Sequence, residues 1–190
     1  SVEGMAKSSG LRVLGALQVT DLSWLEGCKL ESVVLTGLPE LTSIQGLQTA
    51  TALKTLMLGA PQLTDIAPLR DTTTLQHVGL SSQQLKSLAP LGSSTDLRTL
   101  MLKGCVRLTT LHGVEAAAAL ESLSILECPA LTDLAALGNK PMLCHAPKDP
   151  ISMGYTRSST LSSAVGGIST SPGVLELKGA GLITDVGFLA

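Results

Sequence analysis

The feature that most constrains this chain is a seven-residue pattern that returns every 22 or 23 residues. It reads LTDIAPL at residues 63–69, and close variants begin at Leu41, Leu85, Leu108 and Leu131. A repeat of this length is one small structural unit that cannot bury its apolar side alone, so neighbouring units have to share a continuous core. The sequence therefore predicts a solenoid of stacked units.

Five units align on their first leucine and share six columns that hold only aliphatic residues, thirty positions in all. In the first aligned unit these columns are Leu30, Val33, Leu35, Leu41, Ile44 and Leu47, and the other units start at Leu53, Leu75, Leu97 and Leu120. Aromatic residues make up only 2% of the chain, so leucine has to build the core. Alternation at Leu56, Met57 and Leu58 predicts a strand that turns both leucines to one side.

The L-x-x-L-x-L pattern at residues 53–58, followed by a second leucine-rich half, resembles the leucine-rich repeat. The units with LTDIAPL are similar to internalin repeats. The units with Cys105 and Cys128 resemble the cysteine-containing class and trypanosomatid leucine-rich repeat proteins. The resemblance implies an α/β solenoid with a concave parallel sheet of short strands and a convex side of irregular or short helical segments.

One departure from the family concerns the position after each strand, where asparagine commonly bonds to the backbone inside the bend. Here the expected occupants are Leu38, Pro61, Gln83, Cys105 and Cys128. We expect the Thr-Asp pairs at 64–65, 132–133 and 184–185 to compensate, because both side chains can cap nearby amides.

We predict one leucine-rich-repeat domain over residues 1–190, as a piece of a longer chain. Residues 1–29 form an irregular first repeat, about two residues shorter than the others, and residues 30–142 form five regular repeats. Residues 143–171 form an enlarged irregular repeat, in which the spacing of Leu161, Val165 and Ile168 predicts a short helix. Residues 172–190 form a partial last repeat.

Net charge and cysteine content limit the classes of partner and the cellular compartments to expect for this protein. A net charge of −2 and a pI near 5.9 provide no excess of basic residues that could attract a polyanion, so nucleic acid is disfavoured as a partner. The apolar runs are shorter than the ~20 residues that span a bilayer, so no membrane association is expected. Cys105 and Cys128 hold equivalent places in consecutive repeats, which favours buried reduced thiols, with a disulfide as the alternative. We expect an intracellular, reducing compartment: cytoplasm or cytoskeleton, or the mitochondrion.

No set of residues indicates catalysis, a cofactor or a metal site. His77, His112 and His145 are about a repeat and a half apart, so they should not converge. His77 is expected on the concave face and His112 at a convex turn. No Cys/His spacing suits zinc, Gly166-Gly167 lacks the rest of a phosphate loop, and no serine lies in a nucleophile elbow. We therefore predict that the protein is not an enzyme.

The concave face is predicted to bind a protein segment through adaptable, weakly polar side chains. Its fifteen expected positions carry one charge and no carboxylate, and the predicted contact residues are Val34, Met57, His77, Met101, Lys103 and Leu126. The alternative is that the concave face is only solvated and that partner proteins bind to the convex side or to the enlarged repeat. Residues 139–173 carry a charge near +2, and Lys148, Tyr155 and Arg157 are the contact residues expected there.

These observations favour a non-catalytic protein-protein interaction scaffold that is a structural subunit of a larger multi-protein assembly. The alternative is the substrate-recognition module of a ubiquitin ligase, because cysteine-containing repeats resemble those partnered with F-box or RING elements. Contact with RNA, confined to the basic residues between 139 and 173, is a third hypothesis.

Overall fold

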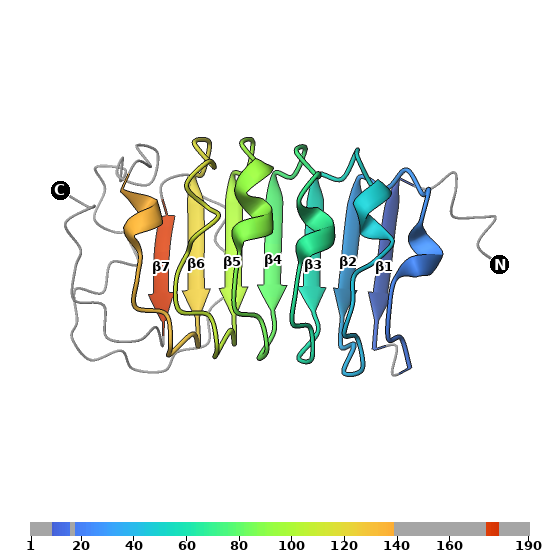
Figure 1. The fold of residues 1–190 in the computed structure, drawn as a ribbon, viewed down its shortest axis with the longest axis horizontal. Helices are drawn as coiled ribbons and strands as arrows, with labels where there is room; N and C mark the ends of the chain where they lie inside the picture. Colours follow the sequence, from blue (N-terminus) through green and yellow to red (C-terminus); the bar gives the residue numbers. More distant parts are fainter. Residues whose placement is uncertain (1–8, 16–17, 139–173, 179–190) are drawn as a thin grey trace.

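The computed structural model describes residues 9–15, 18–138 and 174–178. Seven parallel strands form one sheet in the order of the chain, as Figure 1 shows. They are β1 (Gly10–Leu14), β2 (Ser32–Thr36), β3 (Thr55–Gly59), β4 (His77–Ser81), β5 (Thr99–Lys103), β6 (Ser122–Leu126) and β7 (Val174–Lys178). Each strand therefore pairs with the next unit along the chain, which confirms the predicted leucine-rich-repeat solenoid.

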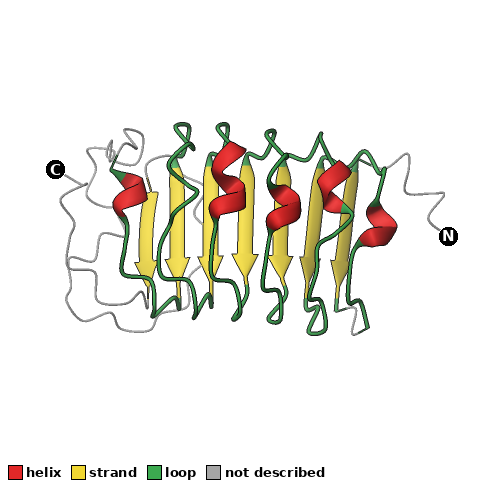
Figure 2. Ribbon diagram, viewed as in Figure 1, coloured by secondary structure: helices red, strands yellow, loops and turns green. Residues whose placement is uncertain are grey.

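Short 3-10 helices lie in most of the segments that return the chain from one strand to the next, all on one side of the sheet (Figure 2), and the segment between β5 and β6 has none. They are η2 (Ser23–Leu25), η3 (Leu47–Thr49), η4 (Ala67–Leu69), η5 (Ala89–Ser93) and η6 (Ala135–Leu137). Proline at the first turn of η4 and η5 presets the backbone angle φ for a helical turn. We call the opposite side of the sheet the open face. It corresponds to the face predicted to be concave.

The strand register corrects the prediction for the first repeat. Leu11 pairs with Val33 and Val13 pairs with Leu35, so β1 and β2 are 22 residues apart, like two regular units. The first repeat is therefore not two residues short, because Leu11 belongs to the second apolar column rather than the first. Trp24 lies in η2 where Pro68 lies in η4.

The core is built around the six aliphatic columns. All thirty positions are buried, and none is more than 3% exposed. Each layer of leucines contacts the layers before and after it, which is why the repeat is stable only as a stack. The sequence pattern identified these thirty positions, but not the further core residues between the columns and in the first repeat, such as Ala60, Leu22 and Leu25.

The bend after each strand differs from the prediction in two repeats. Ala60 and Ser82 point inward and are buried there, whereas Pro61 and Gln83 lie further out. The Ser82 hydroxyl donates to the carbonyl of Leu63 at 2.6 Å. Serine and cysteine thus take over part of the ladder that asparagine usually provides.

Cys105 and Cys128 continue this ladder and carry free, buried thiols, which confirms that they are not bridged. The Cys105 thiol lies 3.8 Å from the carbonyl oxygen of Leu80, and the Cys128 thiol lies 3.9 Å from that of Leu102, one repeat earlier in each case. A hydrogen bond from Cys128 lowers the pKa of Cys105 to about 7. The same contact, together with burial, raises the pKa of Cys128.

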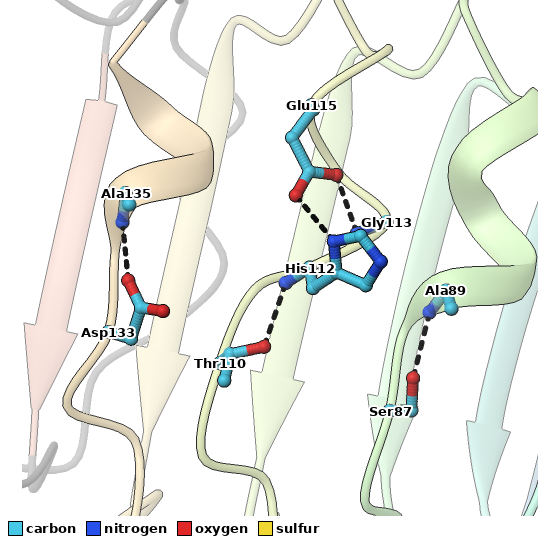
Figure 3. Close-up of polar contacts among 8 residues, drawn as sticks. All are labelled: Ser87, Ala89, Thr110, His112, Gly113, Glu115, Asp133 and Ala135. Carbon is cyan, nitrogen blue, oxygen red and sulfur yellow. Dashed lines mark hydrogen bonds and ion pairs between the residues drawn. The ribbon is translucent and has the colours of Figure 1, made fainter.

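The side of the sheet that carries the short helices is organised by a second ladder of side-chain caps (Figure 3). The backbone N–H of Ala67 donates to Asp65 at 2.8 Å, and that of Ala135 donates to Asp133 at 2.9 Å. The aspartates therefore cap the turns as predicted. Asp21, Ser43, Ser87 and Thr110 accept the same bond in the other units. Asp185 lies outside the described residues.

His112 lies on this side as predicted, exposed and 2.8 Å from Glu115. β7 pairs directly with β6, with Leu123 opposite Leu175. The enlarged repeat, its expected helix and His145 lie outside the described residues. In the described part of the chain no helix is long and apolar enough to cross a membrane. The division of the chain into repeats beyond residue 138 stays a prediction.

Candidate functional site

The open face has a central row contributed by the middle residue of each strand. Register places Arg12, Val34, Met57, Gly79, Met101, Ser124 and Glu176 along it. The row crosses the strands at right angles, one residue about every 4.8 Å. Its middle is apolar and contains two half-buried methionines on either side of a glycine.

Gly79 determines how the methionines lie. A Cβ at this position would overlap the Met57 sulfur and would approach the Met101 Cβ to 3.9 Å. The absence of a side chain on β4 thus lets the Met57 thioether lie across the strand toward Met101. Gly79 is buried for this reason, although it belongs to the open face.

Beside these methionines the open face is hollowed by about 510 Å³. We call this the methionine hollow. Its lining residues are Thr55, Met57, Gln76, His77, Arg98, Thr99, Met101 and Glu121. One wall is therefore apolar, and the other consists of hydroxyl, amide, imidazole and charged groups from the starts of β3 to β6.

The polar wall of the methionine hollow has hydrogen-bonding capacity that the described residues do not use. Arg98 Nη1 lies 3.5 Å from Glu121 Oε1, a long ion pair across two neighbouring units. A guanidinium has five N–H donors, so most of those on Arg98 are not used by this contact. In the part of the chain that the structure describes, the side chains of Gln76 and His77 make no hydrogen bond. The wall can thus still donate to, and accept from, a bound group.

The structure brings three of the predicted contact residues together, because Met57, His77 and Met101 all line the methionine hollow. Val34 and Leu126 are half-buried on the open face, but they do not line the methionine hollow. Lys103 lines another hollow, of about 250 Å³, at the other end of the strands, with Ser82 and Glu127. Lys148, Tyr155 and Arg157 lie outside the described residues.

Sequence reasoning missed Gln76, Arg98 and Glu121, each of which comes directly before a strand. Only alternate strand residues were expected on the open face, and none of those is a carboxylate in the regular repeats. One signal was available: this position is polar or charged in all five regular units, at Glu31, Lys54, Gln76, Arg98 and Glu121. Lys54 and Glu31 form a second cross-strand ion pair, at 3.0 Å.

The chemistry of the hollow suits binding. His77 on β4 and Glu121 before β6 belong to units two strand spacings apart, roughly 10 Å, which is too far for a direct hydrogen bond. Within the described ranges no three His, Cys, Asp or Glu side chains could hold a metal ion together. What the open face offers is an amphipathic depression on a rigid sheet.

No protein-family model matches the chain, and no curated protein sequence matches it. The chain is similar to solved structures of two internalins from Listeria monocytogenes strain 4b F2365. For inlF the identity is 17% and the TM-score 0.45, over 73% of this chain and 53% of that chain. For inlC2 the identity is 22% and the TM-score 0.48, over 73% of this chain and 70% of that chain.

The chain spans about half the length of the internalin inlF. At these identities the likeness concerns the fold alone. The chain's own geometry establishes that fold, through parallel strands in sequence order and six buried columns that recur every 22 or 23 residues. The protein is a leucine-rich-repeat solenoid.

Proposed function

We propose that the protein is a non-catalytic interaction module that binds another protein on its open face. The methionine hollow carries this proposal. It combines two half-buried methionines with hydrogen-bonding groups that have no partner within the described chain, on a sheet whose backbone is fixed by parallel pairing. Unbranched, polarisable methionine side chains adapt to an apolar partner surface.

The remainder of the proposal concerns context. We infer that the solenoid is a structural subunit that holds its partner within a larger assembly. Support comes from the extended row of positions across the strands, which suits a protein segment better than a small molecule. A docked segment would cross several repeats, and a few central contacts, such as those at Met57 and Met101, would supply most of its affinity.

The test is crosslinking and mass spectrometry of partners captured from native cells. Met57→Glu/Met101→Glu places two carboxylates in the apolar wall and should remove one stoichiometric partner. The matched control, Ala118→Glu/Ala135→Glu, adds the same charge at exposed positions away from the open face. Thermal unfolding of both variants verifies the fold. Capture of the same partners by both variants and the wild type would show that the open face is not the working surface.

A second candidate function is substrate recognition in a ubiquitin ligase, favoured by the cysteine-containing 23-residue units around Cys105 and Cys128. A ubiquitin-ligase subunit among the crosslinked partners would support it. A stoichiometric complex that contains none would contradict it.

A further inference from the structure

We propose that Cys105 and Cys128 form a redox-sensitive pair, which a hydroperoxide can oxidise to a reversible disulfide between two consecutive repeats. This inference goes beyond the proposed function and does not depend on it. It rests on the position of the two thiols in the stack, on the contact between them and on their different surroundings.

The stack places the two cysteines within reach of a disulfide. Lys103 pairs with Leu126 in the register of β5 and β6, and each cysteine comes two residues after its member of this pair. Neighbouring strands lie ~4.8 Å apart. Equivalent positions in consecutive units therefore lie within the roughly 4.4–6.8 Å between Cα atoms that a disulfide spans.

The side chains confirm that the two positions are equivalent. The Cys105 thiol contacts the carbonyl of Leu80 and the Cys128 thiol contacts that of Leu102, and these two leucines are partners in the register of β4 and β5. A hydrogen bond also joins the two thiols directly. Both sulfurs thus point into the same space, as a bridge requires.

The two sulfurs have the different roles that peroxide chemistry needs. The contact from Cys128 stabilises the Cys105 thiolate and lowers the pKa of Cys105 to about 7, whereas the pKa of Cys128 is raised. A thiolate is the nucleophilic form of cysteine. Cys105 is therefore the sulfur that attacks the peroxide, and Cys128 is the neighbouring thiol that resolves the product.

The reaction takes place in two steps, written here for hydrogen peroxide. The Cys105 thiolate attacks one peroxide oxygen, the O–O bond breaks, and a sulfenic acid forms while hydroxide leaves. The Cys128 sulfur then loses its proton and attacks the Cys105 sulfur, so that an S–S bond replaces the S–O bond and water leaves. In total, two thiols and one hydrogen peroxide give one disulfide and two molecules of water.

Both thiols are buried, so an oxidant reaches them when the bend after β5 opens. This bend borders a hollow of about 250 Å³, whose lining includes Gly104 and Val106 on either side of Cys105, and Glu127 just before Cys128. Val106 is 44% exposed. A surface bend opens at a lower free-energy cost than the whole stack. Such local opening is enough for a molecule as small as hydrogen peroxide.

The bridge removes native contacts, which keeps it reversible. In the reduced chain the two thiols lie against the carbonyls of Leu80 and Leu102 in buried surroundings. A disulfide has no S–H group, so both carbonyls lose this contact when the bridge forms. A disulfide that opposes native interactions is more easily reduced than one that only adds to them.

The experiment exposes the whole reduced chain to hydrogen peroxide in native buffer. The remaining thiols are then blocked, and mass spectrometry without reduction locates the bridges. The chain has four cysteines. We expect one dominant bridge, between Cys105 and Cys128, and dithiothreitol should restore both thiols without unfolding. The same treatment in urea is the control, because an unfolded chain should give a mixture of pairings that includes Cys28 and Cys144.

Two serine variants separate the roles of the sulfurs. Serine suits this position, since Ser82 occupies it one repeat before Cys105. In Cys128→Ser, dimedone should trap Cys105 as a sulfenic acid, and no bridge should form. In Cys105→Ser, Cys128 should stay reduced under the same peroxide treatment. Circular dichroism verifies the fold of both variants, and if either is unfolded the wild-type comparison with urea decides.

Three results would overturn the inference. The first is that Cys105 and Cys128 both remain thiols in the native chain at peroxide concentrations that bridge the unfolded chain. The second is a native mixture of pairings like that found in urea. The third is a bridge that dithiothreitol reduces only after unfolding, which would make it a permanent crosslink instead of a reversible one.

Discussion

Leu100→Ala should destabilise the solenoid strongly, because Leu100 lies in the middle of the stack. Its side chain is fully buried on β5, and its strand neighbours in the register are Val78 and Leu123. The substitution removes three carbon atoms, which corresponds to about 2.4 kcal/mol of lost transfer free energy. If a cavity of roughly 50 to 100 Å³ persists, it adds about 1–2 kcal/mol. We therefore expect a loss of about 3.5–4.5 kcal/mol in the free energy of unfolding.

The assay is urea unfolding followed by circular dichroism, with the free energy obtained by linear extrapolation. Thr99→Ala is the matched control, because Thr99 is the preceding residue of the same strand and lies half-buried on the open face. It should cost less than about 1 kcal/mol, a common value for a site away from the core. A loss below 1 kcal/mol for Leu100→Ala, or one equal to that of the control, would refute the assigned register.

Trp24 gives an independent reading of cooperativity. It is the only tryptophan and lies in η2 of the first repeat, four repeats before that of β5. If the repeats unfold together, its fluorescence should show the same urea midpoint as the circular dichroism in Leu100→Ala. Separate midpoints would indicate that the coupling between neighbouring repeats is too weak to carry the perturbation to the first repeat.

Three further predictions concern the turns. Glu127 is the one described non-glycine residue with positive φ, at 56°. Glu127→Gly should therefore raise the free energy of unfolding by about 0.5–1 kcal/mol in the same urea assay. A decrease would contradict backbone strain at Glu127. Ser82→Ala should lower the free energy of unfolding by about 1–3 kcal/mol, because the Leu63 carbonyl loses its buried donor. Ser82→Cys should lower it less, since cysteine fills this position in the next two repeats. Equal losses would argue that Ser82 does not belong to the hydrogen-bonding ladder. The side-chain and backbone bonds from Ser23 lower the pKa of Asp21, so its small stabilisation is present above the ordinary carboxyl pKa and is lost as pH falls through the lower folded value. Carboxyl NMR should show the Asp21 pKa rising in Ser23→Ala, and an unchanged value would refute the cap.

The strained Glu127 also illustrates why repeats in one stack are not equivalent. Gly15, Gly37 and Gly104 adopt positive φ at the bend after their strands, as Glu127 does after β6. Sequence reasoning recognised turn formers at this bend but did not predict the backbone conformation of a glutamate there. The backbone N–H of Gly15 and that of Gly104 each donate to the last residue of the next strand, Thr36 and Leu126, at 2.9 Å, so stacking contributes to the conformation of this bend.

The sequence by itself determined the solenoid, the strands of its regular repeats and the thirty column positions of its core. The physical reason is that columns such as Leu56, Leu100 and Leu123 repeat at a period that only stacking can bury, so the pattern and the fold are nearly the same information. The capping aspartates were also predictable, since Asp65 and Asp133 act on amides two residues away. Contacts between residues close in sequence and a strictly periodic pattern can both be recognised from the sequence alone.

Only the tertiary structure decided the register of the first repeat, the inward turn of Ser82 and the existence of the methionine hollow. The register of the first repeat depends on which residues pair across β1 and β2. The inward turn of Ser82 occurs in a bend one residue shorter than that of the 23-residue units, and leucine spacing alone does not specify which bend residue turns inward. The hollow depends on Gly79 leaving room for Met57, and on Gln76, Arg98 and Glu121 reaching the face from positions just before their strands. These are contacts between side chains 22 or more residues apart in different layers, and their positions are set by packing.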